Sequence, residues 1–380
     1  MNKYNKTGKP KILLVANVAK EHVLKFHVPT IKKLVEKGWV VDVACGGKEE
    51  IPYCHRHIVL PIDRSPFKGN LFNGIKQLKR EIKNNCYDIV YCHTEVGGIV
   101  GRMAARSFRK YGVKVVKLDH GFYFYKGAKW FTWALHFPVD KILSKVTDSF
   151  ITINQEDYNL VKHHFKYCKS YIIDGIGVDP GRFDIHEREG IRKTYRAKLN
   201  IPQDAVVLIY LAELSKNKNQ ILLMNALKLA LKERKDIFLV LAGIDHTDGE
   251  YSEYACKAGI EKNVFFLGWR SDVNKLYAMS DICTASSIRE GFGLNLVEAM
   301  YCGLPVIASN NRGHATIIRN GENGYLVDKD DVETFAQRIL SLSNDMSLRK
   351  QFIEIAQAEI FKYSSDSITE KIYEILRAEL

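Results

Sequence analysis

Short apolar runs alternate with longer stretches of mixed polarity along the chain. In its first half the runs are residues 11–18, 40–45, 57–62, 88–93, 114–120 and 149–154. They are rich in β-branched residues and mostly lack an alternation of polar and apolar positions, which indicates strands buried on both faces. The stretches between them are long enough for helices. This half therefore predicts a parallel sheet covered by helices.

The same pattern begins again after residue 183. Its apolar runs are residues 206–214, 237–244, 263–270, 281–287, 304–309 and 324–328. A chain of 380 residues also exceeds the ~250–300 residues at which a single core stops growing. We therefore expect an α/β protein of two Rossmann-like, doubly wound domains that face each other, with ligands bound at the carboxyl ends of their strands.

The domain boundaries follow from a segment rich in Gly and Asp. This segment, residues 174–181, reads as the connection between the two halves. We expect an N-terminal domain over residues 1–183 and a C-terminal domain over residues 184–365. A last helix, at about 366–380, would cross back onto the first domain.

The positive charge is concentrated in the first half. The formal net charge is +12; residues 1–180 hold 30 Lys and Arg against 16 Asp and Glu, whereas residues 181–380 hold 26 against 28. A one-sided basic domain suits an anionic membrane surface or a pyrophosphate-bearing lipid. Nucleic acid would also suit it, but no helix-turn-helix, zinc or RNP motif accompanies the charge. No nucleic-acid partner is expected.

No segment is typical of export or of membrane insertion. The apolar run after Lys11 is too short for a signal peptide or a membrane span. The 8 cysteines are scattered, without a C-x-x-C pair, and several lie in apolar runs, which indicates reduced thiols. We expect a cytoplasmic protein, peripherally associated with the inner face of the cell membrane.

The most specific motif is E-G-F-G-L-N-L-V-E-A-M, which begins at Glu290 and includes Glu298. If its glycines form a turn and a helix starts near Leu294, the backbone N–H groups of Phe292, Gly293 and Leu294 would point at an anion such as a diphosphate. Glu298, one turn into the helix, could then accept hydrogen bonds from both hydroxyls of a ribose. Glu290 would face a transferred sugar. The alternative is a capped helix with two solvated glutamates.

This motif, which continues into Y-C-G-L-P-V-I, resembles the hallmark of glycosyltransferase family 4, the retaining enzymes of GT-B fold. The resemblance extends over nearly the whole chain, through H-T-E-V-G-G, H-G-F-Y-F-Y-K-G, I-T-I-N-Q-E-D-Y, G-I-G-V-D, E-L-S-K-N-K-N and F-L-G-W-R-S-D-V. It implies transfer of a sugar from a UDP-sugar to an undecaprenyl-pyrophosphate-linked saccharide in capsular or exopolysaccharide biosynthesis. The sugar implied is an N-acetylated or deoxy hexosamine such as N-acetyl-fucosamine.

The resemblance also implies roles for single residues. It assigns Glu290 to the hydroxyls of the donor sugar and Lys218 to the diphosphate, where a cation would offset the charge of the leaving group. Glu213 departs from the pattern, because many members carry there an Arg that partners the Lys. The donor-binding candidates are Lys216, Gly268, Arg270, Phe292, Gly293, Leu294 and Glu298.

Two histidines each follow a predicted strand of the first domain. His120 precedes Gly121 and would lie under the transferred sugar as a catalytic residue, although a lone histidine is more often structural. His93 and the neighbouring Glu95 are candidates for binding the acceptor. The loop after the first strand, A-N-V-A-K-E-H, lacks the paired glycines of many relatives, so its acceptor contacts are not predicted.

Aromatic rings and lysines are mixed in residues 123–133. Lys126 and Lys129 lie among six Tyr, Phe and Trp residues in this segment. It can be read as core residues with solvated lysines, or as an interfacial element with rings at the level of lipid headgroups. On the second reading Lys126 is an acceptor-binding candidate.

Neither a metal nor a cofactor is expected. Asp328 and Asp330 superficially match a carboxylate pair that holds a divalent ion, but they precede a helical stretch and are better read as N-capping residues. His55 and His57 alone do not make a metal site.

The resemblance implies a front-face reaction in which the donor's β-phosphate accepts the proton of the acceptor hydroxyl. The alternatives are a nucleotide-sugar 2-epimerase of the same fold and a non-catalytic nucleic-acid-binding protein, supported only by the basic first half.

Overall fold

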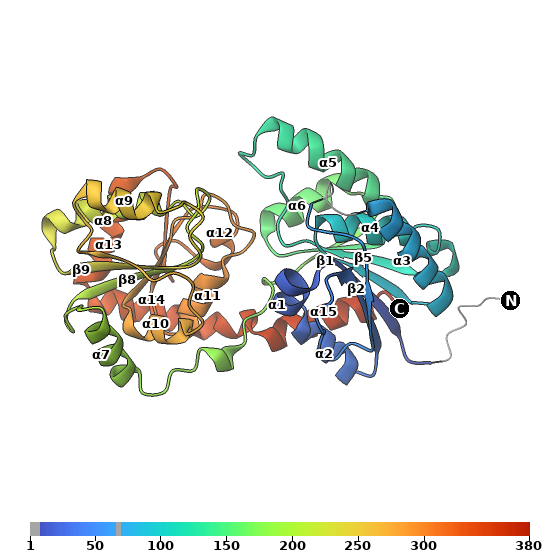
Figure 1. Ribbon diagram of the computed structural model, residues 1–380, viewed down its shortest axis with the longest axis horizontal. Coiled ribbons are helices and arrows are strands. Elements are labelled where there is room, and N and C mark those ends of the chain that lie inside the picture. Colours follow the sequence, from blue (N-terminus) through green and yellow to red (C-terminus); the bar gives the residue numbers. More distant parts are fainter. Residues whose placement is uncertain (1–7, 66–69) are drawn as a thin grey trace. The chain divides into compact units, whose positions relative to one another are not determined.

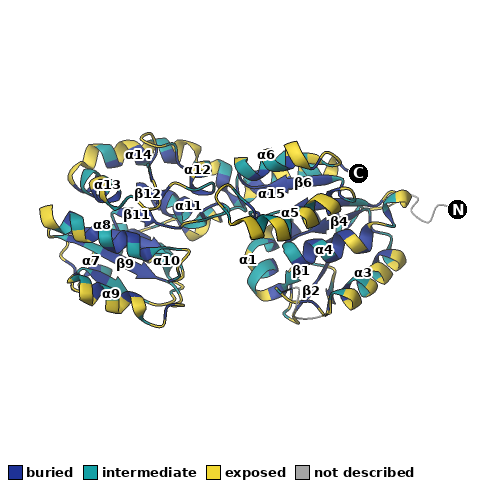
Figure 2. Ribbon diagram, turned by 90° about the horizontal axis from the view of Figure 1, so that it is seen from above, coloured by how far each residue is buried: buried dark blue, intermediate teal, exposed yellow. Residues whose placement is uncertain are grey.

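The computed structural model describes residues 8–65 and 70–380 (Figure 1). The chain divides into two compact units, the first made of Met1–Gly177 with Ser365–Leu380 and the second of Val178–Ser364. Each unit is a parallel sheet with helices on both faces. Figure 2 shows that the strands are the most deeply buried parts of each unit, while the outer faces of the helices are exposed. Two Rossmann-like domains are thus confirmed.

The sheet of the first unit has seven strands in the order β3-β2-β1-β4-β5-β6-β7. They are β1 (Lys11–Val18), β2 (Val40–Gly46), β3 (Arg56–Val59), β4 (Ile89–Cys92), β5 (Lys114–Leu118), β6 (Ser149–Thr152) and β7 (Lys169–Ile172). The six predicted runs all contain strands, whereas β7 was missed because this edge strand lacks a buried apolar run. The strand order reverses between β1 and β4, which is where such sheets bind ligands.

Helices of the first unit cover both faces of this sheet. They are the π-helix η1 (Ala19–Val23), α1 (Leu24–Phe26), α2 (Val28–Glu36), α3 (Leu71–Asn85), α4 (Glu95–Ala105), the 3-10 helix η2 (Arg109–Tyr111), α5 (Trp130–Ser144), α6 (Gln155–His164) and α15 (Ser365–Arg377). Figure 1 shows α3, α4 and α5 on one face of the sheet, and α2 and α15 on the other.

The last helix, α15, packs on the first unit, as the sequence predicts. Glu370 forms an ion pair with Lys33 of α2, with 2.5 Å between carboxylate oxygen and ammonium nitrogen. The Tyr373 ring packs edge-on against Trp39 at a centroid distance of 6.0 Å. Apolar residues on one side of α15 are buried, so the helix completes the core of a unit that is distant in sequence.

The second unit repeats this design. Its sheet has the order β10-β9-β8-β11-β12-β13. The strands are β8 (Val206–Leu211), β9 (Ile237–Ala242), β10 (Val264–Phe266), β11 (Ile282–Ala285), β12 (Val306–Ser309) and β13 (Tyr325–Val327). All six predicted runs form strands. The order reverses between β8 and β11, which marks the corresponding ligand position.

Ten helical segments belong to this unit. They are η3 (Pro180–Arg182), α7 (Arg188–Lys198), α8 (Gln220–Glu233), α9 (Glu250–Ala258), α10 (Val273–Met279), α11 (Leu294–Tyr301), α12 (His314–Ile317), α13 (Val332–Asn344), α14 (Met346–Glu359) and η4 (Ile360–Tyr363). α8, α9 and α13 lie on one face of the sheet, and α7 and α10 on the other (Figure 1).

The connection between the units ends earlier than residue 183. The backbone N–H of Val178 donates to the carbonyl of Tyr363 at 2.9 Å, and Val178 also pairs with Ser364 as a β-bridge. The Phe183 ring packs against Tyr277 of α10 at 6.2 Å between centroids. These contacts place residues 178–183 in the second unit.

Two general expectations can be compared with the structure. Within residues 8–65 and 70–380, no helix has the length and apolar character needed to cross a membrane. All eight cysteines are free, and four of them are fully buried. The state of these thiols in the cell stays a prediction.

Candidate active site

Two charged residues of the second unit lie at the carboxyl ends of β8 and β11. Lys218 lies in the loop between β8 and α8, and Glu290 in the loop between β11 and α11. The two loops are tied together, because the backbone N–H of Ile288 donates to the carbonyl of Asn217 at 2.8 Å and the Ser286 hydroxyl donates to the Lys218 carbonyl at 2.8 Å. Neighbouring parallel strands therefore bring these residues together from distant parts of the sequence.

Lys218 and Glu290 form a short ion pair. The ammonium nitrogen lies 2.5 Å from Oε1 of Glu290, and both side chains are about one-fifth exposed (21% and 19%). The Ser287 hydroxyl donates to the same oxygen at 2.6 Å and is itself hydrogen-bonded to Tyr210. Burial, the largest single influence, would raise the pKa of Glu290, but the Lys218 charge, His314 and the hydrogen bonds from Lys218 and Ser287 together outweigh it, so the pKa is lowered. This carboxylate is therefore ionised at neutral pH.

The helix start predicted at Leu294 is found there. Gly293 has φ +122°, a conformation that L side chains rarely adopt, and a Cβ at this position would lie 3.0 Å from the His314 ring. The first N–H groups of α11 have no partner within the helix, and the helix dipole makes this end favourable for an anion. Phe292 is buried, and its ring packs edge-on against Tyr363 at 5.7 Å. Its side chain thus belongs to the support of the turn.

Glu298 lies one turn into α11. Its carboxylate accepts a hydrogen bond of 3.2 Å from the Tyr277 hydroxyl. Burial raises the pKa of Glu298 to about 7, with Tyr277 and Arg182 opposing the rise. The two glutamates of one motif thus differ in charge state, because only Glu290 has a cation within ion-pairing distance.

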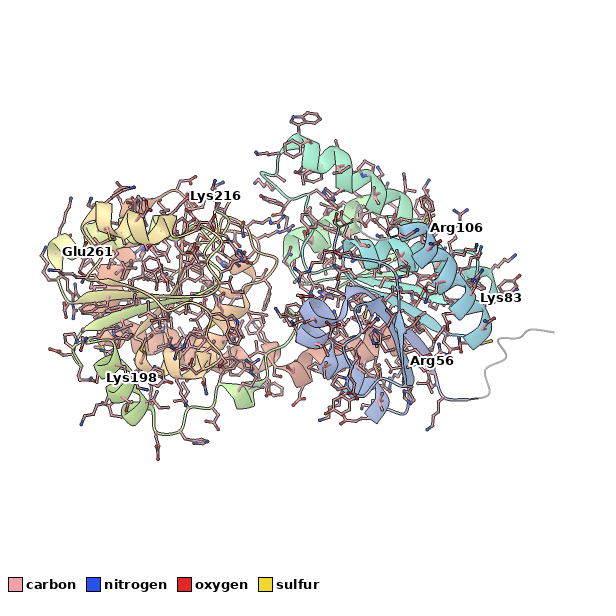
Figure 3. The ribbon with its side chains drawn as sticks, viewed as in Figure 1. Arg56, Lys83, Arg106, Lys198, Lys216 and Glu261 are labelled. Carbon is pink, nitrogen blue, oxygen red and sulfur yellow. The ribbon has the colours of Figure 1, made fainter. Side chains whose placement is uncertain are left out.

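The remaining donor-binding candidates lie apart from this ion pair. The Arg270 guanidinium is bound by Asp272, with its Nε 2.8 Å from a carboxylate oxygen. Gly268 is exposed in a turn with φ +63°. Lys216 is exposed and points outward from the unit (Figure 3). Glu213, at the position of the usual Arg, accepts from the Ser215 hydroxyl at 3.3 Å. That these residues contact the nucleotide sugar stays a prediction.

In the first unit, His93 and His120 lie at the carboxyl ends of the adjacent strands β4 and β5. The structure brings them together, with ring centroids 6.1 Å apart. His22 and His27, from the loop after β1, join them, so that one nitrogen of each of the four rings lies within 4.8 Å of the others. We call these four residues the histidine cluster. Glu95 begins α4 and pairs with His136 of α5.

The aromatic segment divides into a buried and an exposed part. Phe124 belongs to a buried cluster against which Trp133 packs. Trp130, by contrast, is 79% exposed. Lys126 is exposed, and its backbone N–H donates to Glu156 at 2.6 Å. The exposed apolar surface continues along α5 through Phe131, Leu135, Val139 and Ile142. We call these four side chains with Trp130 the apolar face of α5.

Two family models match the chain: "Glycosyl transferase 4-like" over residues 11–154 and "Glycosyl transferases group 1" over residues 191–359. EpsD of Bacillus subtilis (strain 168), a protein named as a glycosyltransferase, is 39% identical over 370 residues, which are 97% of this chain and 96% of EpsD. The chain belongs to the GT4-type glycosyltransferases. The resemblance inferred from the motifs is thereby confirmed.

Two further comparisons fit this family. The UDP-Gal:alpha-D-GlcNAc-diphosphoundecaprenol alpha-1,3-galactosyltransferase of Escherichia coli is 27% identical over 280 residues, 71% of this chain and 70% of that enzyme. The crystal structure of Anabaena Alr3699/HepE in complex with UDP and glucose superimposes with a TM-score of 0.79 at 20% identity, covering 97% of this chain and 100% of that one. This likeness confirms the GT-B fold of the glycosyltransferase.

Sequence reasoning missed His314 of this glycosyltransferase. His314 is fully buried, its Nδ1 lies 2.8 Å from the Ser309 carbonyl oxygen, and its Nε2 has no hydrogen-bond partner among the described residues. A Cβ at Gly313 would lie 2.7 Å from the backbone nitrogen of Phe292. The loop after β12 therefore packs directly on the turn of the motif. The glycine before a histidine at a strand end was the available signal.

Two readings concerning metals need correction. The N-cap of α13 is Asp331, whose carboxylate accepts from the Thr334 N–H at 2.9 Å, rather than Asp328 or Asp330. No histidine cluster was expected from residue spacing, yet one forms. It is the only group of three or more potential metal ligands found in the described part of the glycosyltransferase.

Proposed function

We propose that the chain is a retaining glycosyltransferase that moves a sugar from a UDP-sugar onto a lipid-linked saccharide in capsular or exopolysaccharide biosynthesis. The observation that carries the proposal is the Lys218–Glu290 pair at the start of α11. A cation, an ionised carboxylate and a helix N-terminus within one loop cluster suit a ligand that combines a diphosphate with a hydroxylated sugar.

Each part of the donor matches one of these groups. The diphosphate is bound by the Lys218 ammonium and by the backbone N–H groups of Phe292, Gly293 and Leu294. Glu290 accepts hydrogen bonds from the sugar hydroxyls, and Glu298 accepts them from the ribose. Lys216, Gly268 and Arg270 remain candidates for the rest of the nucleotide. The names of the E. coli relative and of the HepE complex, which include UDP-Gal and UDP, support a UDP-sugar.

The transfer needs no protein nucleophile. The acceptor oxygen forms a bond to the anomeric carbon on the face from which UDP departs, while the bond between that carbon and the β-phosphate oxygen breaks. The acceptor's proton goes to a β-phosphate oxygen. Lys218 and the start of α11 stabilise the negative charge that develops on UDP, so that no metal ion is needed at the diphosphate.

The first unit supplies the acceptor side in this proposal. His120 approaches the transferred sugar, and Glu95 and Lys126 contact the acceptor. His93, the third acceptor candidate, is wholly buried and is not given a direct contact. The E. coli relative acts on a diphosphoundecaprenol-linked sugar, as its name says, which supports a lipid-linked acceptor here. The donor sugar we would test first is N-acetyl-fucosamine.

The apolar face of α5 fits a peripheral position on an anionic membrane. Its exposed apolar side chains are accompanied by exposed Lys126, Lys129, Lys141 and Lys145. Apolar side chains enter the headgroup region of a bilayer, and lysines interact with anionic lipids. The lipid-linked acceptor lies in the same membrane, so the protein would meet it there.

The test is transfer of label from radiolabelled UDP-sugars to the lipid fraction of a membrane extract. The proposal predicts a labelled lipid-linked saccharide with retained anomeric configuration and release of UDP. Glu290→Ala should lower transfer at least ~100-fold, because a charge-assisted contact in an enclosed site is lost. The exposed Lys232→Ala of α8 is the matched control.

Other outcomes would overturn the proposal. An epimerised nucleotide sugar without transfer would indicate a 2-epimerase. Binding of nucleic acid without turnover of any nucleotide sugar would indicate a non-catalytic protein.

A further inference from the structure

The histidine cluster is built from three segments that end at one place. His22 lies in the π-helix η1 after β1, His27 directly precedes α2, and His93 and His120 follow β4 and β5. β1, β4 and β5 are consecutive strands of the sheet, so their carboxyl ends meet. π-helices are rare and are frequently found at functional sites. The convergence therefore depends on the fold and on an unusual local conformation.

Three of the eight ring nitrogens in the cluster are buried without a hydrogen-bond partner among the described residues. His22 and His27 share one hydrogen bond, with 2.9 Å between their Nε2 atoms. Both nitrogens of His93 and Nε2 of His120 are buried without a partner among the described residues. His93 is wholly buried. Buried polar atoms are almost always paired in folded proteins, so these nitrogens point to a ligand.

The electrostatic surroundings keep the four rings neutral. Burial, reinforced by neighbouring cationic groups, lowers the pKa of His22 to about 2 and those of His27 and His93 well below the usual value. Burial likewise lowers the pKa of His120 to about 4, although Asp119 opposes the shift. A neutral imidazole has the free lone pair that a metal ion requires.

The charged groups around the cluster largely compensate one another. The Lys117 ammonium lies 3.0 Å from a carboxylate oxygen of Asp119. The positive charge of Arg64 also lowers the pKa of His22. A divalent ion at the cluster would therefore meet a lysine that is already paired with a carboxylate, together with the positive charge of Arg64.

We propose that His22, His27, His93 and His120 bind one divalent transition-metal ion of the zinc type. Imidazole nitrogens suit Zn²⁺, Cu²⁺ and Ni²⁺ and disfavour Mg²⁺ and Ca²⁺. Tetrahedral coordination at ~2.0–2.1 Å implies ligand nitrogens roughly 3.3 Å apart. The nitrogens already lie within 4.8 Å of one another, so modest ring rotations complete the site.

The ion would have a defined structural effect. It would join the η1 segment and the residue before α2 to the ends of β4 and β5. Each ligand histidine uses one nitrogen, so the ring of His120 is held in one orientation and its other nitrogen remains for a substrate. The site is independent of the Lys218–Glu290 pair, which belongs to the second unit. Its test therefore does not require transferase activity.

The experiment titrates metal-free, full-length protein with Zn²⁺ and, separately, with Co²⁺. We expect one ion per chain, a melting temperature raised by several degrees by bound Zn²⁺, and the intense visible absorption of tetrahedral Co²⁺. His22→Gln, which removes one ligand and keeps a polar group beside His27, should weaken Zn²⁺ binding at least tenfold. The exposed His186→Gln of the second unit should bind as the parent does.

Folding of His22→Gln is compared with the parent by circular dichroism without metal. X-ray absorption of the Zn²⁺-loaded parent gives a second measurement that needs no variant, and it should show a first shell of imidazole nitrogen without sulfur. Equal Zn²⁺ affinity in parent and His22→Gln, binding abolished by His186→Gln, a sulfur-containing shell, or no stoichiometric binding in the parent would each overturn the proposal.

Discussion

The same position in the two sheets carries opposite kinds of chemistry. At the carboxyl ends of β8 and β11, Lys218 and Glu290 are ionised and paired. At the carboxyl ends of β1, β4 and β5, burial lowers the pKa values of four histidines, and three of their nitrogens are buried without a hydrogen-bond partner among the described residues. Parallel sheets place ligands at these ends regardless of side chain. In our two proposals the residues at each end then decide which ligand is accepted, an anion in the second unit and a cation in the first.

The two glutamates of the α11 motif also differ in their chemistry because of their surroundings. Both are largely enclosed, yet the pKa of Glu290 is lowered and that of Glu298 is raised to about 7. Burial acts on both carboxyls in the same direction. The difference comes from Lys218, whose ammonium is paired with Glu290 only. Substitutions in the two units and at the two glutamates test whether these differences in charge determine ligand binding.

The largest effect is expected from Lys218→Met. Removing the cation that stabilises the departing UDP should lower turnover on the order of 1000-fold. It also leaves Glu290 without its ionic partner and should destabilise the fold. The double variant with Glu290→Gln should regain thermal stability but not transfer. Turnover of the double variant near that of the parent would show that the pair is structural only.

Glu298→Gln should act in opposite directions on transfer and on stability. Transfer should fall about 100-fold, since hydrogen bonds of ribose to a carboxylate are lost. The pKa of Glu298 in the folded protein, about 7, lies above the ordinary glutamate value of 4.5, so ionising this group costs stability that grows from pH 4.5 to pH 7 and reaches its full size above pH 7. The variant should therefore have a free energy of unfolding higher by up to about 3 kcal/mol at pH 8.

Denaturant unfolding at pH 8 and pH 5 measures this stability difference, which should be small at pH 5. A variant less stable than the parent at pH 8 would contradict the assigned charge state of Glu298.

Charge reversal beside the apolar face of α5 should weaken membrane binding at least ~30-fold at low salt, because the attraction of two lysines is lost. Each lysine near an anionic surface contributes ~1 kcal/mol, and salt screens the interaction. Lys126→Glu with Lys129→Glu should therefore reduce co-sedimentation with anionic vesicles at low salt. Trp130→Ala should reduce the part that persists at high salt. The matched control reverses two exposed lysines of the second unit, Lys257→Glu with Lys262→Glu.

Unchanged sedimentation of the Lys126 and Lys129 variant, or an equal loss in the control, would contradict a membrane-binding role for this part of the first unit.

The smallest effect is expected from divalent cations at the donor. Adding Mg²⁺ or Mn²⁺ to chelator-treated protein should change the transfer rate less than twofold, because Lys218 and the start of α11 already offset the diphosphate charge. The chelator-treated protein is first reloaded with one Zn²⁺ per chain, so that only the donor site is tested. An absolute requirement for Mg²⁺ would show that the diphosphate needs a metal.

Predictability from the sequence follows the physics of each feature. Buried strands are continuous apolar runs, so twelve of the thirteen strands found in residues 8–65 and 70–380 were predicted, whereas the half-exposed β7 has no such run. The α11 motif was readable because its turn, helix and glutamates are contiguous. The histidine cluster could not be predicted, because its members come together only when β1, β4 and β5 lie side by side in the sheet. The exposure of residues 123–133 was likewise not predictable, since rings such as Phe124 and Trp130 look alike in sequence but differ in burial.

The central claim, that Lys218 and the start of α11 hold the diphosphate of a nucleotide sugar, is tested most directly by calorimetric binding of UDP and of uridine. The parent should bind UDP at least tenfold more tightly than uridine, a difference of about 1.4 kcal/mol. Lys218→Met should lose most of this difference while its affinity for uridine stays unchanged. Equal loss of both affinities, or a UDP affinity that does not depend on Lys218, would contradict the assignment.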